Sequence, residues 1–504
     1  TRSFNKQHNL NVSAGWEAAS GTTESTNAHY RGFPSGEFHS LNYAAEVYKK
    51  PTRTENTTRR VSVLASANYT WNDIYLVDAS VRFDGSSEFG ANQKWAPFFS
   101  GGLGVNIHNY DFFKSNGYIN KLKLRASYGR TGKVNFPAYA ATTMYETLFD
   151  EWYITGYGAV LKALGNKDLT WEKTDKLSVG IETKTFHDRL TVDFEYYYNK
   201  TIDLVNDVTL SQTSGFSTYK DNMGQVANKG VELKLRADIY RDRNWNVALW
   251  GNMAHNKNEI LKISDSQKAY NERVAAYYKN EALYQETLGL SHGAEYSVPL
   301  PQYEEGASLT SIWAVRSLGI DPTTGKEIFL NRDGSIADKW NAAQEVVVGN
   351  TEPKCSGAFG LNLSYKNWTL FASFLYEWGG QEYNQTLVNN VENADLVNKN
   401  VDLRVLTDRW KKPGDIAQFK DIKDRGMTTL PTSRFVQDKA LVRLNSLNVS
   451  YDFNRDWIKK HLRMNLLRLE ASTSDLINWS SIKQERGLSY PRSWKVEFSL
   501  KAQF

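Results

Sequence analysis

The sequence predicts an all-β protein, a transmembrane antiparallel β-barrel with long extracellular loops, and three observations lead to that prediction. Apolar and polar residues alternate in about 14 segments, strictly in the clearest of them, which separates two faces as only a strand does. Short turns alternate with long connections along the 504-residue chain. No apolar run approaches the ~18 residues of a membrane-spanning helix, and the mean hydropathy of −0.56 suits strands with one polar face.

The alternation is clearest near the end of the chain. From Trp494 to Phe504, apolar side chains at every second position oppose Lys495, Glu497 and other polar residues. The expected strands cover residues 8–17, 60–71, 73–83, 97–107, 121–128, 175–186, 189–199, 231–239, 244–255, 356–366, 367–378, 440–453, 465–475 and 494–504.

The connections between these strands fall into two kinds. Short ones are Asn72, 187–188, 241–243 and 366–367, and long ones are 18–59, 130–174, 256–355 and 379–439. Outer-membrane barrels have short periplasmic turns and long outside loops, which favours a membrane barrel. Aromatic residues near strand ends, such as Trp71, Trp245, Trp368 and Trp378, suit interfacial girdles. The alternative is a soluble β-sandwich with these aromatics in its core.

The polar faces are strongly charged, as in Lys121, Lys123 and Arg125 on one strand and 232–238 on another. Basic residues cost ~2 to 4 kcal/mol each at mid-membrane, so these faces are expected to meet water or a plug. Plugged transporters use about 22 strands. Periodicity alone leaves open whether the chain forms a modest closed barrel or part of a larger one.

No pattern in the sequence points to catalysis, a cofactor or nucleic acid. The eight histidines show no metal-ligand spacing, and phosphate-binding glycine motifs and a nucleophile elbow are absent. A glycosidase-like carboxylate pair in a loop stays open. Residues 321–325 and 331–334 are expected to form hairpin turns rather than a calcium loop. A net charge of +5 is too diffuse for nucleic acid, and Cys355 has no partner for an internal disulfide.

Ordered motifs give the chain a resemblance to a known family. They are 82–90 (RFDGSSEFG), 95–100 (WAPFFS), 122–129 with Thr131-Gly132, 169–172 (LTWE), 228–232 (NKGVE), 319–325 (GIDPTTG), 407–410 (TDRW) with 413–415, 442–444 and 490–494. In this order they resemble the SusC/RagA-like, TonB-dependent outer-membrane transporters of Bacteroidetes. The motifs themselves are interpreted as structural, marking turns, strand ends and packing.

The resemblance implies more than the residues show. It implies that residues 1–504 are the C-terminal portion of a barrel of about 22 strands, with the plug and an N-terminal extension outside this chain. It also implies a SusD-like surface lipoprotein as a lid, TonB acting through the missing N-terminal part, and a place among outer-membrane lipids. Phe504 matches the terminal aromatic of such barrels.

The expected function is import of oligosaccharides or peptides rather than enzymatic activity. Alternatives left open are a barrel scaffold that docks other subunits of a larger outer-membrane complex, and a secreted carbohydrate-active β-protein. Exposed loop aromatics would stack on sugars or peptide side chains, although they would also serve to pack the loops together. The candidate ligand contacts are Trp152, Tyr153, Tyr157, Tyr296, Tyr303, Trp313 and Trp340.

Overall fold

The computed structural model describes most of the chain as β-strands. It describes all residues except 1, 5–6, 35–39, 115–116, 135, 137–138, 210–217, 223, 266, 270, 273–302, 399–400, 427–428, 454 and 483–493. Among the described residues, one antiparallel sheet of 16 strands dominates. Within the same part of the chain, no helix is long and apolar enough to cross a membrane.

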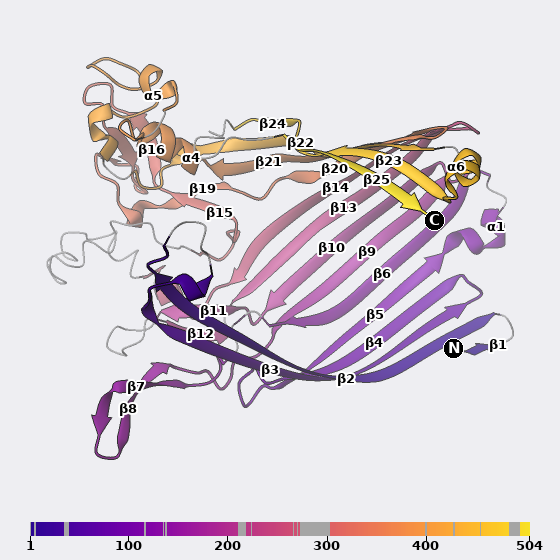
Figure 1. Cartoon of the computed structure of the whole chain (residues 1–504), viewed down its shortest axis with the longest axis horizontal. Helices are drawn as coiled ribbons and strands as arrows, with labels where there is room; N and C mark the ends of the chain where they lie inside the picture. The colour runs from indigo at the N-terminus through magenta and orange to yellow at the C-terminus, as the bar shows by residue number, and fades with distance from the viewer. Residues whose placement is uncertain are drawn as a thin grey trace. The chain divides into compact units, whose positions relative to one another are not determined.

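The strand order of the large sheet follows the chain, so sequential strands are neighbours (Figure 1). Its strands are β1 (Arg2–Phe4), β2 (His8–Arg31), β3 (Glu46–Trp71), β4 (Tyr75–Ser86), β5 (Trp95–Asn106), β6 (Ile119–Lys133), β9 (Glu172–Thr185), β10 (Leu190–Ile202), β13 (Gln225–Arg241), β14 (Trp245–Lys262), β20 (Cys355–Tyr365), β21 (Trp368–Tyr383), β22 (Val436–Asp452), β23 (Leu466–Thr473) and β25 (Val496–Gln503), with β24 (Asn478–Ser480) beside β22. Each of the predicted strands is present, which confirms the predicted all-β class.

Smaller elements occupy the connections. The small sheets pair β7 (Met144–Tyr153) with β8 (Gly156–Ala163), β11 (Val205–Thr209) with β12 (Thr218–Asn222), β15 (Ser311–Ala314) with β19 (Val346–Asn350), and β16 (Arg316–Ile320) with β17 (Glu327–Leu330) and β18 (Ile336–Ala337). The helices are η1 (Leu41–Tyr43), η2 (Ile107–Asn109), α1 (Asp111–Lys114), η5 (Ala342–Gln344), α4 (Gln385–Leu387), η6 (Val388–Glu392), α5 (Arg404–Thr407), η7 (Ile422–Gly426), η8 (Ser433–Phe435) and α6 (Arg455–Leu462).

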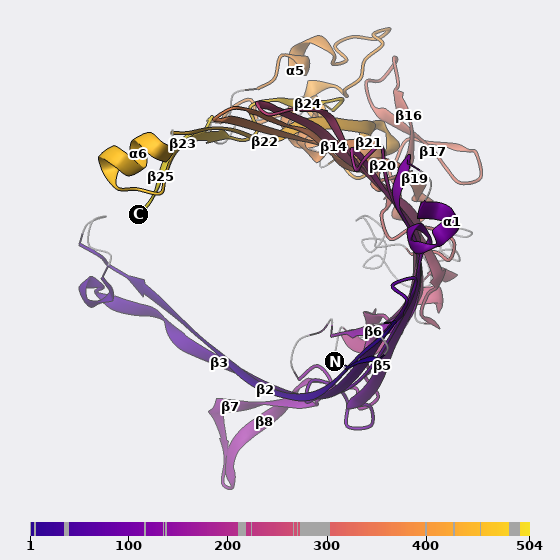
Figure 2. The same ribbon diagram turned by 90° about the vertical axis from the view of Figure 1, so that its right-hand side faces the viewer.

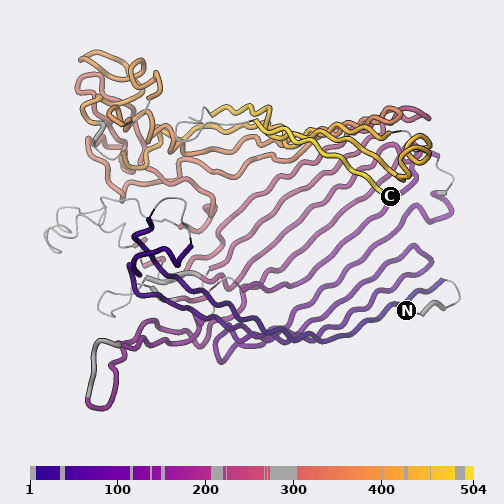
Figure 3. The backbone as a smooth tube through the Cα atoms, in the orientation of Figure 1, coloured from indigo at the N-terminus to yellow at the C-terminus, as the bar shows by residue number. Residues whose placement is uncertain are grey.

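The long connection predicted at 18–59 is wrong. Strands β2 and β3 continue through it as a hairpin of 24 and 26 residues, visible as two adjacent tubes (Figure 3). Its outer part is polar on both faces, so the apolar alternation disappears while threonine still favours extended backbone. Cross-strand polar contacts stabilise it there: the hydroxyls of Thr22 and Thr57 lie 3.1 Å apart, and Arg53 lies 2.9 Å from Glu24.

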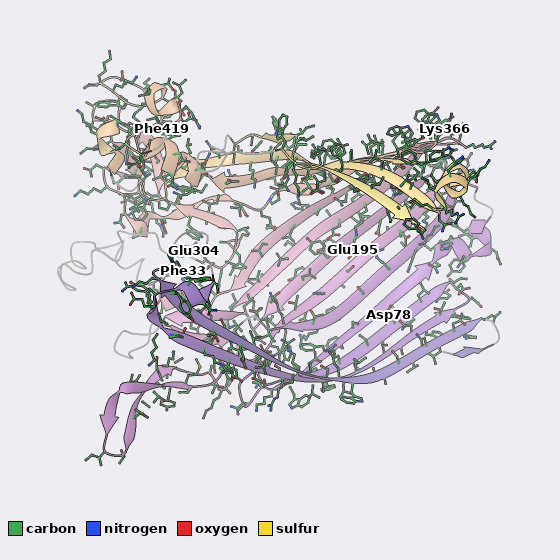
Figure 4. All side chains as sticks on the ribbon, viewed as in Figure 1. Phe33, Asp78, Glu195, Glu304, Lys366 and Phe419 are labelled. Atoms are coloured by element: carbon green, nitrogen blue, oxygen red, sulfur yellow. The ribbon has the colours of Figure 1, made fainter. Side chains whose placement is uncertain are left out.

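The chain divides into two compact units. The first comprises 1–103, 127–176 and 201–224, and the second comprises 104–126, 177–200 and 225–504. In the second unit, Figure 4 places Lys366 and Phe419 at opposite ends of the strands, with Glu195 between them. The short turn at Lys366, with a left-handed φ of 49°, therefore lies opposite the long loops, as the alternating connections predict.

Each unit has its own buried cluster of apolar side chains. In the first unit it comprises Phe89, Ala96, Phe98, Phe136, Ala141, Leu169 and Trp171. In the second it comprises Leu387, Val388, Val391, Ala394, Val405, Phe419 and Phe435. Both clusters lie in or beside loops, so most side chains of the long strands face their surroundings rather than a protein core.

Candidate functional site

The strands of the second unit carry chemically opposite faces. On one face, Leu249, Phe359 and Trp378 are exposed by 48%, 44% and 69%. Register places Phe359 opposite Phe374, with ring centroids 5.2 Å apart. The other face, which we call the polar face, carries charged side chains such as Arg125. The burial of apolar side chains in lipid would stabilise the first face and leave the second for water.

A charged ladder crosses the polar face at mid-strand. Arg125 Nη2 lies 2.8 Å from Asp193 Oδ1 and 2.6 Å from Glu195 Oε2. Ser178 donates its hydroxyl to Glu195 at 2.6 Å, and Lys121 lies 2.6 Å from Glu182. These charged side chains are about a third exposed or less. The ladder therefore gives this face a surface of paired charges, as the sequence predicts for a side that meets water or a plug.

Amides extend the polar face toward the loop end. Asn228 Oδ1 accepts hydrogen bonds from Asn256 Nδ2 at 3.2 Å and Asn258 Nδ2 at 2.9 Å. Glu352 accepts from the amide of Asn256 and, at 3.0 Å, from the backbone N–H of Asn258. Tyr197 donates to Asn256 Oδ1 at 2.9 Å. Amide, hydroxyl and carboxylate groups at this spacing can bind the hydroxyl or peptide groups of a polar solute.

The polar side of the first unit contains a cavity of about 440 Å³ between strands and loop residues. It is lined by Arg60, Ser62, Arg82, Asp84, Gly85, Gly132, Lys133, Val134 and Trp171. Arg82 donates to Ser62 Oγ at 2.9 Å and lies 2.5 Å from Asp84. Arg60 lies 3.2 Å from the buried Glu88. The cavity thus offers guanidinium donors held in position by carboxylates.

Trp171 connects this cavity to the buried cluster of the first unit, since it belongs to both. Trp171 stacks on Phe89 at 4.2 Å and meets Phe98 edge-on at 5.4 Å. A Cβ on Gly132 would lie 2.1 Å from Phe98, and one on Gly90 would lie 2.0 Å from the carbonyl oxygen of a loop residue. Residues of the motifs at 82–90, 95–100 and 169–172 therefore pack against one another, in line with the interpretation that they are structural. Sequence reasoning missed that they converge, because they are far apart along the chain.

A buried ion pair holds together the loops of the second unit. Arg434 Nη2 lies 2.9 Å from Glu327 and 2.7 Å from the fully buried Glu392. Burial by itself lowers the pKa of Arg434, but the hydrogen bonds and charges of both carboxylates outweigh it and raise that pKa. Nearby, Arg409 donates to the carbonyl oxygens of Val405 and Lys420 at 3.1 and 2.9 Å. Burial lowers the pKa of Arg409.

The two segments weighed as calcium ligands are hairpin turns. The backbone N–H of Thr323 and the hydroxyl of Thr324 donate to Asp321 and hold the pKa of its carboxyl below its usual range. Strands β16, β17 and β18 pair on either side of these turns, as predicted. Among the described residues, no group of three or more His, Cys, Asp or Glu side chains could hold a metal ion.

The candidate aromatic contacts are divided between the two units. Trp152, Tyr153 and Tyr157 lie on the β7–β8 hairpin of the first unit, where Tyr157 is 54% exposed. Tyr303, Trp313 and Trp340 lie in the loops of the second unit and are half-buried. Trp340 donates its indole N–H to the carbonyl of Pro431 at 2.9 Å, so it packs the loops together. Tyr296 lies outside the described residues.

Comparison with known proteins now gives the family. Residues 1–466 match the family model described as TonB dependent receptor-like, beta-barrel. The chain belongs to this family. TonB-dependent receptor barrels lie in the bacterial outer membrane, so the apolar face meets lipid and the polar face lines the lumen. The family is one of receptors and transporters rather than of enzymes.

Individual relatives agree with the SusC/RagA resemblance. TonB-dependent receptor P39 of Formosa agariphila is 26% identical over 555 residues, which cover 100% of this chain and 52% of the relative. TonB-dependent receptor SusC of Bacteroides thetaiotaomicron is 29% identical over 255 residues, 48% of this chain and 25% of SusC. The solved structure of the RagAB peptide transporter shares the fold, with a TM-score of 0.81, 22% identity, and coverage of 100% of this chain and 54% of that one. The chain thus spans about half the length of the relatives that it matches over its full extent.

Proposed function

We propose that this chain is the C-terminal part of the barrel of an importer that carries oligosaccharides or peptides across the outer membrane. The observation that carries the proposal is the hydrated polar face, with its charged ladder and amide network, in a TonB-dependent receptor barrel. A solute moving along this wall would exchange water for amide, hydroxyl and charged groups, at little net loss of hydrogen bonds.

For the proposed importer we expect the partners that the SusC/RagA resemblance implies. A SusD-like surface lipoprotein would cover the loop end, and TonB would act through the part of the protein that precedes this barrel. The compact loops of the second unit, stabilised by Arg434 and Glu392, would give such a lid a rigid surface to meet. RagAB, whose structure shares this fold, is a peptide transporter, and this supports peptides as one of the two cargo classes.

Binding of peptides and oligosaccharides to the purified full-length protein tests both the importer proposal and the role of the loop aromatics as ligand contacts. We expect one class, a pool of short peptides or of oligosaccharides, to bind saturably. Trp313→Ala should weaken binding about two- to twelve-fold, because stacking on one aromatic ring is worth ~0.5 to 1.5 kcal/mol. The matched control is Trp16→Ala, which removes a 77% exposed tryptophan from a membrane-facing strand.

The results of this experiment distinguish the importer proposal from the assignment of Trp313 as a ligand contact. Saturable binding that Trp313→Ala leaves intact would remove Trp313 from the ligand contacts and keep the importer. Binding of neither class, by the protein alone or with its copurifying lipoprotein, would instead favour the alternative of a docking scaffold.

A further inference from the structure

The helix α6 lies at the short-turn end of the second unit, opposite the loops. It joins β22 to β23 and packs beside β23 near the C-terminus (Figures 1 and 2). Another hairpin of this unit, β20–β21, turns in two residues at this end. A helix in place of such a turn places additional side chains where the strands leave the membrane.

The helix has an apolar side and a basic side. At 100° per residue, Trp457, Ile458, His461 and Leu462 share one side, and Asp456, Lys459 and Lys460 share the other, with Arg463 directly after the helix. Ile458 is fully buried, whereas Trp457 and Leu462 remain 52% and 41% exposed. The helix ends where Arg463 adopts a left-handed φ of 56°.

The basic side also carries one acidic residue, Asp456, among its cations. Lys459, Lys460 and Arg463 are exposed, and no described carboxylate forms an ion pair with any of them. By contrast, Arg468 on the adjoining strand lies 2.5 Å from Asp452. Lys459, Lys460 and Arg463 outnumber the single carboxylate of Asp456, so this end of the helix keeps a positive potential that an anion would neutralise.

Aromatic side chains of the apolar face mark the membrane boundary at the same end. Trp368 and Tyr451 lie 4.8 Å apart by ring centroids, and Tyr451 lies 5.1 Å from Phe453, which leads toward α6. Aromatic belts of this kind sit at headgroup level in membrane barrels. On the helix, Trp457 and Leu462 are two further exposed apolar side chains at this end of the unit.

We propose that α6 is a binding surface for anionic phospholipids of the leaflet at the short-turn end. Lys459, Lys460 and Arg463 contact the phosphate and other acidic groups of the lipid head, while Trp457 and Leu462 enter the interfacial layer. The surface combines an apolar edge with a basic side, the arrangement by which interfacial helices bind acidic lipid. This binding does not depend on what the barrel transports.

Native mass spectrometry of the detergent-purified protein tests this assignment with dioleoylphosphatidylglycerol and dioleoylphosphatidylcholine as probes. We expect tighter binding of phosphatidylglycerol, weakened by salt. The triple variant Lys459→Gln/Lys460→Gln/Arg463→Gln should bind it at least about ten-fold more weakly, because each basic residue contributes several-fold near an acidic surface. Phosphatidylcholine binding should not change.

A matched control removes the same charge at the other end of the unit. Lys411→Gln/Lys412→Gln/Lys423→Gln changes three loop lysines and should bind phosphatidylglycerol as the wild type does. Brominated phosphatidylglycerol should also quench part of the tryptophan fluorescence of the wild type. Trp457→Phe should abolish that part of the quenching. Equal binding of the two lipids, or unchanged phosphatidylglycerol binding in the α6 variant, would overturn the proposal.

Discussion

Among single residues, Glu392 carries a charge that is completely enclosed in the loops of the second unit. It is fully buried, lies 2.7 Å from Arg434, and packs within the cluster formed by Val391, Val405 and their neighbours. A buried charge of this kind is tolerated only with a partner, since losing the partner leaves an uncompensated ion in a poorly solvated site.

Glu392→Gln is therefore expected to loosen the loops by ~1 to 3 kcal/mol, because Arg434 keeps its ion pair with Glu327 but loses one charged hydrogen-bond partner. Amide hydrogen exchange across α5 and residues 418–420 would measure the local free energy of opening. The control Glu305→Gln removes a carboxylate that is 44% exposed and lies 3.0 Å from Lys268. Because an exposed ion pair contributes little, this control should leave the exchange rates of the loops unchanged. Similar effects of the two substitutions would contradict the role assigned to Glu392.

The importance of Arg434 could not have been predicted from the sequence. Its carboxylate partners are separated from it by 107 and 42 residues, and no local spacing connects them. The motif at 407–410 is recognisable in the sequence, but the hydrogen bonds from Arg409 to loop carbonyls depend on backbone groups that a sequence does not locate. Charges on strands are easier to assign, since period two alone places Lys121 and Arg125 on one face.

At the scale of elements, glycine positions in the first unit decide how closely β6 approaches the aromatic cluster. Gly132 lies against the ring of Phe98, which is itself 8% exposed and packed on Trp171. An added methyl group has no space there unless the cluster shifts.

Gly132→Ala should consequently destabilise the protein by ~1 to 3 kcal/mol through overpacking. The free energy of unfolding would be measured in urea. The folded fraction would be read from the heat-modifiable electrophoretic mobility of the folded barrel. Gly15→Ala is the matched control, because the nearest atom to its Cβ is 4.0 Å away. Its effect should stay within ~0.5 kcal/mol. A tolerated Gly132→Ala would show that the cluster is less tightly packed than the geometry indicates.

Strand prediction from alternation succeeds where one face of a strand meets an apolar environment. It locates the long strands from β4 to β25 of the large sheet. It fails for the outer halves of β2 and β3 and for β7 and β8, where no apolar period exists. It also cannot supply the register that brings Asn228, Asn256 and Asn258 together, because register is set by pairing between strands.

For the molecule as a whole, an apolar face and a hydrated face on the same strands place the chain in the outer membrane with a polar lumen wall. In the second unit the loops at one end are compact, and the helix at the other end carries more cations than carboxylates. We infer that this arrangement serves the passage of a polar solute across the membrane.

Energised uptake by living cells is the decisive measurement for this inference. In the native bacterium, fluorescent peptide pools and fluorescent oligosaccharides would be followed into the periplasm of wild-type, deletion and complemented strains, with and without a protonophore. We predict that the deletion abolishes uptake of one cargo class, that complementation restores it, and that the protonophore blocks it in the wild type. Undiminished uptake of both classes by the deletion strain would contradict the proposed import function.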